Sequence, residues 1–341
     1  MSSWYYAEET ENDQILSSRV RLARNLGKYP FQRKLAESGA NAIAQEVQTA
    51  IDYINEKDLH SKLLVHELTG INQQIFLEKH MASPKFVLGA LPKSIYTDEE
   101  ENVSIMVNEE DHVRIQCIVP GKDLPRALTI ANKLDDLIEN HLDFAFDREL
   151  GYLTSCPTNV GTGLRASYMI HLPCLDRTNL LKKLFPYITR SGLTLRGIYG
   201  EGTIPMGSVF QLSNQITTGI SENEIIAVLE DVTYNIIKRE NQTRDKILST
   251  RQNYLQDKVY RAYGILTYCR KISVQEAMSL LSDIRLGYHA KILDLPKPQK
   301  PIYQLMVEIQ PGHLYHMAGQ TMNDVETDIA RADFLRETFD I

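Results

Sequence analysis

The sequence predicts an α+β protein, in which a mainly antiparallel sheet flanked by helices is followed by a helical C-terminal domain. Two observations carry this prediction. Apolar residues occupy every second position from Val113 to Val119, which is the period of a half-buried strand, and helical patterns alone remain after Ser221. A mixed part of the chain is therefore followed by a helical part.

The mixed part is expected to contain helices and short strands in alternation. Residues 38–59 have helical spacing, residues 85–119 are typical of short strands, and helical spacing returns over residues 124–146. Extended segments are then predicted at residues 168–172, 193–199 and 209–212.

The helical part opens with a helix start signal. Ser221 and Glu224 form a capping-box pattern, and Ser273 with Glu276 forms a second one. The proline-rich segment 296–301 predicts a stiff, extended break between helices. We therefore divide the chain into a mixed domain at residues 1–240 and a helical domain at residues 241–341.

The composition is that of an ordinary globular protein of 341 residues, with 37 basic and 44 acidic residues and a net charge of −7. This charge gives no global attraction to nucleic acid or to a membrane, and we expect neither as a partner. No apolar run reaches about 18 residues and no signal-peptide pattern is found, so we expect a cytoplasmic protein. The four cysteines lie far apart, which favours reduced thiols and predicts no protein metal site.

Two charged segments could form anion sites. In residues 17–24, Arg19 and Arg21 share one face if the segment is a strand, although a solvated basic strand edge has the same pattern. In residues 108–114, Glu110 precedes Arg114, so a carboxylate and an arginine could hold a cation and an anion together. Acidic loops at strand ends are also common for solubility alone.

Two further segments combine glycines with reactive or charged side chains. Cys156 is followed by a proline and a Gly/Thr-rich turn that leads to Arg165, as in a backbone-supported site, although a free cysteine is more often a small buried hydrophobe. Arg196 precedes a glycine-rich loop that carries Glu201, although glycines in a plain turn look the same.

Together the four segments closely resemble the guanidino kinases, the family that includes phosphagen kinases and the bacterial protein-arginine kinases. The matching strings are Ser-Ser-Arg-Val-Arg at 17–21, Asn-Glu-Glu-Asp-His-Val-Arg at 108–114, Cys-Pro-Thr-Asn-Val-Gly-Thr at 156–162, Arg-Ala-Ser at 165–167 and Arg-Gly-Ile-Tyr-Gly-Glu at 196–201. Several motifs in the same order are far more specific than any one of them.

The resemblance implies a role for individual residues. Glu110 and Glu201 would be catalytic and grip the acceptor guanidinium, with the Cys156 thiol beside it in a supporting role. The implied ATP-binding residues are Ser17, Ser18, Arg19, Val20, Arg21, His80, Arg114, Arg165, Ala166, Ser167, Tyr168, Met169, Arg196, Gly197, Ile198, Tyr199 and Gly200. The implied cosubstrate is ATP with Mg²⁺, the metal being held mainly by the nucleotide phosphates.

Two features favour the bacterial branch of the family. Phosphagen kinases carry a helical domain before the first arginine motif, whereas Arg19 lies near the first residue of this sequence. Residues 327–332 are similar to the Arg-Asp-x-x-Arg-Ala motif by which the bacterial branch recognises phosphoarginine, which makes Asp328 and Arg331 candidates for an allosteric phosphoarginine site. Thr327 replaces the first arginine of that motif.

The resemblance thus implies ATP-dependent phosphorylation of arginine side chains in proteins, which marks them for a Clp protease in bacterial stress response and protein quality control. It also implies an activating adaptor as a partner, and it leaves open whether the helical domain forms a homodimer. The residues support the chemistry, because a guanidinium of pKa about 12.5 needs a carboxylate to take its proton before it can attack phosphorus. Two alternatives stay open: a phosphagen-type kinase acting on free arginine, and a phosphoarginine-binding adaptor with vestigial activity.

Overall fold

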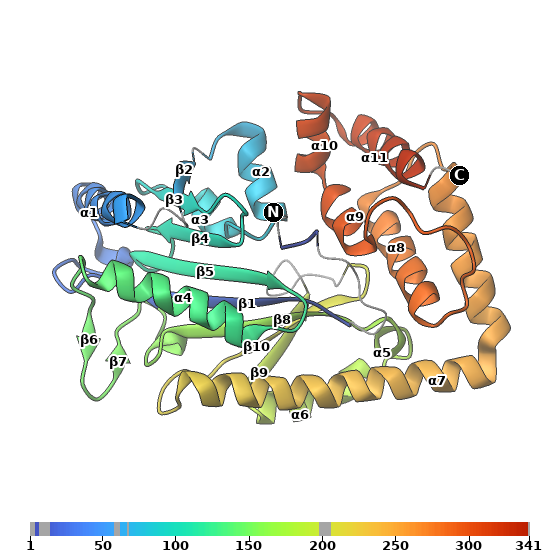
Figure 1. Ribbon diagram of the computed structural model, residues 1–341, viewed down its shortest axis with the longest axis horizontal. Coiled ribbons are helices and arrows are strands. Elements are labelled where there is room, and N and C mark those ends of the chain that lie inside the picture. Colours follow the sequence, from blue (N-terminus) through green and yellow to red (C-terminus); the bar gives the residue numbers. More distant parts are fainter. Residues whose placement is uncertain (1–3, 7–13, 58–61, 67, 198–205, 340–341) are drawn as a thin grey trace. The chain divides into compact units, whose positions relative to one another are not determined.

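The computed structural model describes residues 4–6, 14–57, 62–66, 68–197 and 206–339 (Figure 1). These residues form two compact units. The first unit consists mainly of residues 17–168 with residues 213–229, and the second mainly of residues 169–212 with the chain from residue 230 onward.

The first unit is built on an antiparallel sheet with strand order β2-β3-β4-β5-β1-β8. Strand β1 pairs antiparallel with β5, and β4 pairs antiparallel with both β5 and β3. Strand β1 is therefore an interior strand, flanked by β5 and β8. The strands are β1 (Ile15–Arg24), β2 (Leu64–His66), β3 (Ser94–Thr97), β4 (Val103–Val107), β5 (Val113–Pro120) and β8 (Leu164–His171).

Two long helices supply most of the apolar surface that packs on this sheet. Helix α1 (Glu37–Lys57) and helix α4 (Leu124–Glu139) contact each other, and they contact β4 and β5 respectively. Each buries one apolar stripe, which includes Ile43 and Val47 in α1 and Ala131 in α4. The smaller elements of this unit are η1 (Gln32–Lys34), α2 (Gly70–Glu78), α3 (Pro84–Leu88), β6 (Phe146–Asp147), β7 (Gly151–Tyr152) and η2 (Pro157–Asn159).

The second unit is mainly helical. Strands β9 (Leu193–Gly197) and β10 (Val209–Asn214) pair at the end of the sheet order. Helix α7 (Glu222–Tyr268) is the longest element and leaves helical geometry at Arg251, where it kinks. The remaining helices are α5 (Pro173–Arg177), η3 (Leu181–Lys183), α6 (Phe185–Arg190), α8 (Val274–His289), α9 (Ile302–Glu308), α10 (Pro311–Ala318) and α11 (Asp324–Thr338).

Buried polar contacts join the helices of the second unit. Glu240 of α7 is buried, and its two carboxylate oxygens accept the backbone N–H groups of Cys174 and Leu175 at 2.8 Å each. These N–H groups lie in the first turn of α5, so Glu240 caps that helix from another element. Asn241, the next residue, accepts a hydrogen bond of 2.7 Å from Gln14.

Most of the predicted elements are present. Helix α1 and strand β5 are confirmed within two residues, and Ser221 and Ser273 both accept the N–H group three residues on, as predicted. No strand occurs after residue 214 in the described part of the chain. The predicted domain boundary at residue 240 falls inside α7 and stays a prediction.

Two local predictions were wrong. Helix α4 ends at Glu139 rather than 146, because the chain turns at residues 140–142 and Ala145 donates its N–H to the carbonyl of Asn25 instead of forming a helical bond. Helix α3 begins at Pro84, in a stretch predicted to form strands, because the Ser83 hydroxyl accepts the N–H of Phe86 and caps it.

The four cysteines are free thiols. No helix in the described ranges combines the length and the apolar character needed to cross a lipid bilayer.

Candidate active site

Three neighbouring strands of the first unit carry five arginines, and four of them form the candidate site. Arg19 and Arg21 alternate along β1 with the fully buried Val20 between them, so the two arginines lie on one face of the sheet. Arg114 lies on β5 and Arg165 on β8, the two strands that flank β1. We call these four residues the arginine cluster. The alternative of a solvated strand edge is wrong for Arg19 and Arg21, because β1 is an interior strand.

The charges of the arginine cluster are poorly balanced. Burial lowers the pKa of Arg21 well below its usual value, and repulsion from Arg114, Arg19 and Arg165 lowers it further, with Glu109 as the opposing charge. The Nε atom of Arg21 is buried and has no hydrogen-bond partner among the described residues. A cationic group in this condition is stabilised by any multiply charged anion that reaches it.

The adjacent Glu109 and Glu110 have different environments. The Glu109 side chain is 1% exposed, pairs with Arg114 at 2.7 Å and accepts a hydrogen bond from the Ser83 hydroxyl. Burial tends to raise the pKa of Glu109, but Arg114 and Ser83 outweigh it and the pKa is lowered. The Glu110 side chain is 34% exposed, and it pairs with the exposed Lys85 at 3.4 Å. Glu109 is thus committed to the fold, whereas Glu110 is accessible to a substrate.

A buried carboxylate joins the Glu110 loop to the Cys156 loop. One oxygen of Asp111 accepts both the Nδ2 of Asn25 and the backbone N–H of Ser155, each at 2.6 Å. Asp111 is 2% exposed, and burial raises its pKa. Since Asp111 follows Glu110 and Ser155 precedes Cys156, this contact fixes the two candidate catalytic residues relative to each other.

The turn after Cys156 brings the chain back to β1. Cys156 is half-buried, and its Sγ lies 3.1 Å from the hydroxyl of Thr158. Gly163 has a positive φ of +68°, and a Cβ at that position would lie 2.7 Å from the carbonyl oxygen of Ala23. Glycine is therefore required where β8 begins beside β1. The alternative that Cys156 is a small buried hydrophobe is wrong, because the residue is only half-buried.

Comparison with known proteins places this geometry in a family. The sequence profile of the ATP:guanido phosphotransferase C-terminal catalytic domain matches residues 42–243, and that of the protein-arginine kinase McsB C-terminal domain matches residues 252–341. The protein-arginine kinase of Pelotomaculum thermopropionicum is 43% identical over 341 residues, covering 99% of this chain and 96% of its own. This chain belongs to the protein-arginine kinase family. The protein-arginine kinase of Moorella thermoacetica is 44% identical over 342 residues, covering 98% of this chain and 97% of its own length.

Solved structures of guanidino kinases share the fold. Lombricine kinase matches with a TM-score of 0.59 at 22% identity, over 69% of this chain and 68% of that chain. The duplicated taurocyamine kinase from Schistosoma mansoni matches with a TM-score of 0.61 at 21% identity, over 79% of this chain and 39% of that chain. The predicted guanidino kinase fold is confirmed, and the chain is a kinase of the protein-arginine kinase family.

Several predicted ATP-binding residues of this family member are buried in the first unit. Ser18 donates its hydroxyl to the carbonyl of Gly121 at 2.6 Å and accepts the N–H of Asp123 at 2.8 Å, so its side chain ties β1 to the start of α4. Ser17, Val20, Ala166, Ser167 and Tyr168 are also buried. Their backbone and packing, rather than exposed side chains, would shape an ATP site.

His80 lies close enough to the arginine cluster to feel its charge. Burial, with a smaller contribution from Arg19, lowers the pKa of His80 to about 3. The ring is therefore neutral near pH 7. His80 has a positive φ of 55°, as part of the turn after α2.

The other predicted residues lie elsewhere. Met169 is buried, and Met169, Arg196 and Gly197 belong to the second unit. Ile198, Tyr199, Gly200 and the candidate catalytic Glu201 lie outside the described residues.

The candidate phosphoarginine residues both lie on α11. Arg331 is 1% exposed and pairs with Asp328 at 2.7 Å, and it also donates to the carbonyls of Ile309 and Ile272 at 2.8 Å each. Thr327 is buried and donates its hydroxyl to Asn323. Phosphoarginine can bind to these two residues only if it separates Arg331 from Asp328. The allosteric site stays a prediction.

Sequence reasoning missed the role of the third arginine in the first segment. Arg24 is 1% exposed, pairs with Asp135 of α4 at 2.5 Å, and lies with its Cζ 3.5 Å from the centre of the Tyr152 ring. Two signals were present: Arg24 lies at the opposite strand parity to Arg19, and Asp135 interrupts the apolar stripe of α4.

Proposed function

We propose that this chain transfers the γ-phosphate of ATP to arginine side chains displayed on proteins. The observation that carries the proposal is the arginine cluster, in which burial and mutual repulsion lower the pKa of Arg21. Membership of the protein-arginine kinase family supports ATP as the anion for this cluster and a protein-bound guanidinium as the acceptor.

The arginine cluster fits a triphosphate. The unpartnered Nε of Arg21 offers a donor to a phosphate oxygen, and the four guanidinium groups are already placed before the nucleotide arrives. Phosphoryl transfer spreads negative charge over the oxygens of the transferred group, which such preorganised cations stabilise. Mg²⁺, held mainly by the nucleotide phosphates, would neutralise further charge.

Glu110 is a half-exposed carboxylate, so a bulky acceptor can reach it. We propose that it orients the acceptor guanidinium and receives its proton as the nitrogen–phosphorus bond forms and the bond from the γ-phosphorus to the ADP oxygen breaks. Glu201 is the second proposed carboxylate, and the Cys156 thiol supports the guanidinium from the loop that Asp111 holds in place.

Phosphoamino-acid analysis after incubation with ATP and either casein or free arginine tests the acceptor. We expect phosphoarginine in casein, with a higher kcat/KM than for free arginine. A higher value for free arginine would support the phosphagen-type alternative. No transfer to either acceptor, with phosphoarginine binding retained, would support the adaptor alternative.

Substitution of the acceptor carboxylate tests the chemistry. Glu110→Ala is expected to lower kcat by roughly 10² to 10⁴ and to leave ATP affinity within about twofold, because Glu110 engages the guanidinium rather than the phosphates. Glu201→Ala should behave alike. Lys85→Ala, which removes the exposed partner of Glu110, is the matched control and should stay within about threefold. Near-normal turnover of Glu110→Ala would end this assignment.

We further propose that proteins carrying phosphoarginine pass to a Clp protease in the cytoplasm during bacterial stress and quality control, with an activating adaptor and a homodimeric kinase. Family membership supports this role. Casein should be degraded by a purified Clp protease faster with this chain and ATP than with the Glu110→Ala variant. Equal degradation rates with the two kinase forms would contradict the role in degradation. Sedimentation of the kinase tests whether it is a homodimer.

A further inference from the structure

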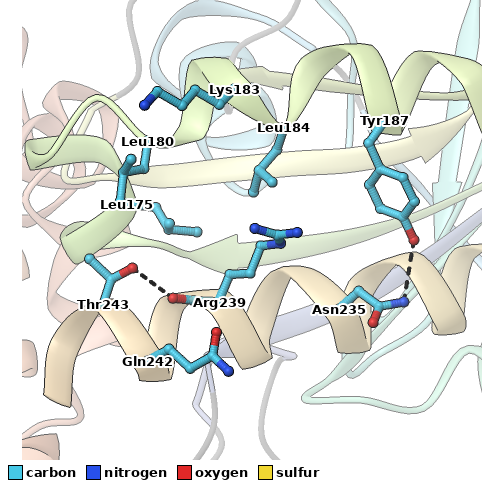
Figure 2. Close-up of a pocket in the computed structure, with 9 residues that line it drawn as sticks. All are labelled: Leu175, Leu180, Lys183, Leu184, Tyr187, Asn235, Arg239, Gln242 and Thr243. Carbon is cyan, nitrogen blue, oxygen red and sulfur yellow. Dashed lines mark hydrogen bonds between the residues drawn. The ribbon is translucent and has the colours of Figure 1, made fainter. Parts of the chain in front are cut away.

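The second unit contains a pocket of about 430 Å³ between α7 and the segment from α5 to α6 (Figure 2). None of its lining residues is among those proposed for catalysis, ATP binding or phosphoarginine binding. The lining residues are Leu175, Leu180, Lys183, Leu184, Tyr187, Asn235, Arg239, Gln242 and Thr243.

One wall of the pocket is apolar. Leu175 and Leu184 are buried and Leu180 is half-buried, so they form a leucine floor on the side of α5 and α6. The Nδ2 of Asn235 donates to the Tyr187 hydroxyl at 3.3 Å and joins α7 to α6 at one end (Figure 2). An aliphatic or aromatic group of a ligand gains free energy by displacing water from this floor.

The opposite wall carries a positive charge that no described residue neutralises. Arg239 extends from α7 across the pocket toward Leu184 (Figure 2), and its guanidinium forms no hydrogen bond or ion pair with a described residue. Lys183 comes from η3, on the same side of the pocket as the leucines, and its ammonium also has no such partner in the described ranges (Figure 2). Among the nine lining residues there is no carboxylate.

The nearest acid in sequence is already committed elsewhere. Glu240 follows Arg239, but it is buried and both its oxygens accept N–H groups at the start of α5. Arg239 is thus set against the leucine floor without an internal counter-ion. Arg239 is exposed, but its guanidinium extends toward the leucines (Figure 2), so the apolar body of a bound ligand would shield its contact with an anion from water.

We propose that this pocket binds a small organic anion, with its carboxylate or similar head group on Arg239 and Lys183 and its apolar body on the leucine floor. The volume lies within the range of small-molecule pockets. A neutral apolar ligand would leave both cations unpaired, and phosphoarginine would find no carboxylate for its guanidinium. The competing explanation is that Arg239 only covers the leucines with its aliphatic stem, as long cationic side chains do.

Calorimetric titration of the full chain with octanoate, and with octanol as the uncharged control, tests the proposal. We expect octanoate to bind in a ratio of one to one and at least about tenfold more tightly than octanol, because the alcohol lacks the charge-assisted contact. The titration contains neither ATP nor a protein acceptor. Its failure therefore leaves the proposed kinase activity untouched, and failure of that activity leaves the binding result untouched.

Matched variants locate the binding site. Arg239→Gln should weaken octanoate binding by about tenfold or more and Lys183→Gln by a few fold, since an ammonium cannot hold a carboxylate through two parallel hydrogen bonds as a guanidinium does. The controls are Lys238→Gln and Lys182→Gln, exposed neighbours on the same elements that do not line the pocket, and they should stay within about twofold. All four changes are at surface positions, and unfolding temperatures verify that each variant is folded.

Two results would overturn the proposal. One is equal affinity for octanoate and octanol, which would leave a merely apolar pocket. The other is equal loss in Arg239→Gln and Lys238→Gln, which would reduce the effect to net charge. Loss confined to the two pocket variants supports the site.

Discussion

Two buried cationic regions of this molecule differ in what their arginines contact. Arg331 in α11 has its Nε and one terminal nitrogen occupied by two backbone carbonyls and Asp328, all from the same chain. Arg21 in β1 has a buried Nε without a described partner and is repelled by three neighbouring arginines. Burial alone therefore does not reveal the role of an arginine. An arginine whose acceptors come from its own chain completes the fold, and one without them leaves donors for a ligand.

Replacing Arg21, whose Nε has no described partner, should lower catalysis without lowering stability. Arg21→Ala is expected to lower kcat/KM by roughly 10² to 10³, because one preorganised donor to the transferred phosphoryl group is lost. Its free energy of unfolding should be unchanged or higher, because repulsion within the arginine cluster is relieved. Kinetics with a protein acceptor and urea unfolding measure both quantities. A folding defect with unaltered kinetics would reverse the comparison.

Replacing Arg331, whose donors are occupied, should lower stability rather than catalysis. Arg331→Met is expected to lower the free energy of unfolding by about 2 to 3 kcal/mol, because Asp328 and two carbonyls lose their partner. Lys271→Met, an exposed cation just before α8, is the control and should change stability by less than about 0.5 kcal/mol. If urea unfolding gives the same value for both variants, Arg331 does not hold the helices together.

Asp111 tests whether a buried carboxylate acts by its charge or by positioning two catalytic loops. Asp111→Ala should lower kcat about tenfold to a hundredfold with little change in KM for ATP, because the Glu110 and Cys156 loops lose their shared acceptor. Asp111→Asn should restore most of the rate, since one oxygen accepts both hydrogen bonds. If Asn and Ala are equally slow, the charge rather than the positioning contact matters.

The smallest effect concerns pH. The pKa of His80 is about 3 in the folded chain and about 6.5 when unfolded, so the unfolded state binds more protons between these values. The stability from His80 is therefore complete above pH 6.5 and is lost as pH falls toward 3, by at most about 1.4 kcal/mol per pH unit. His80→Asn, which tolerates the positive φ, should lose less stability than the unchanged chain between pH 7 and pH 5. Parallel losses would show that His80 is protonated normally.

The sequence was sufficient where a local period determines geometry. Alternation along one strand places Arg19 and Arg21 together and Arg24 on the other face, and capping patterns locate two helix starts. It could not distinguish the roles of Glu109 and Glu110, because their burial depends on Ser83 and Arg114 from other elements. The anion pocket has no sequence signature, since its residues are spread over three helical segments and α7 without a motif. Helix α4 ends early for a tertiary reason, the pairing of Ala145 with Asn25.

The contacts at residues 240 and 241 of α7 bear on how relatives could be recombined. The first family profile ends at residue 243 and the second begins at residue 252. Glu240 and Asn241, near the end of the first profile, hold α5 and Gln14 in place. A chimera that exchanges its C-terminal part with that of a relative should keep both residues with the N-terminal parent. The kink at Arg251 is the natural crossover point, because α7 already departs from helical geometry there and the second profile starts at the next residue.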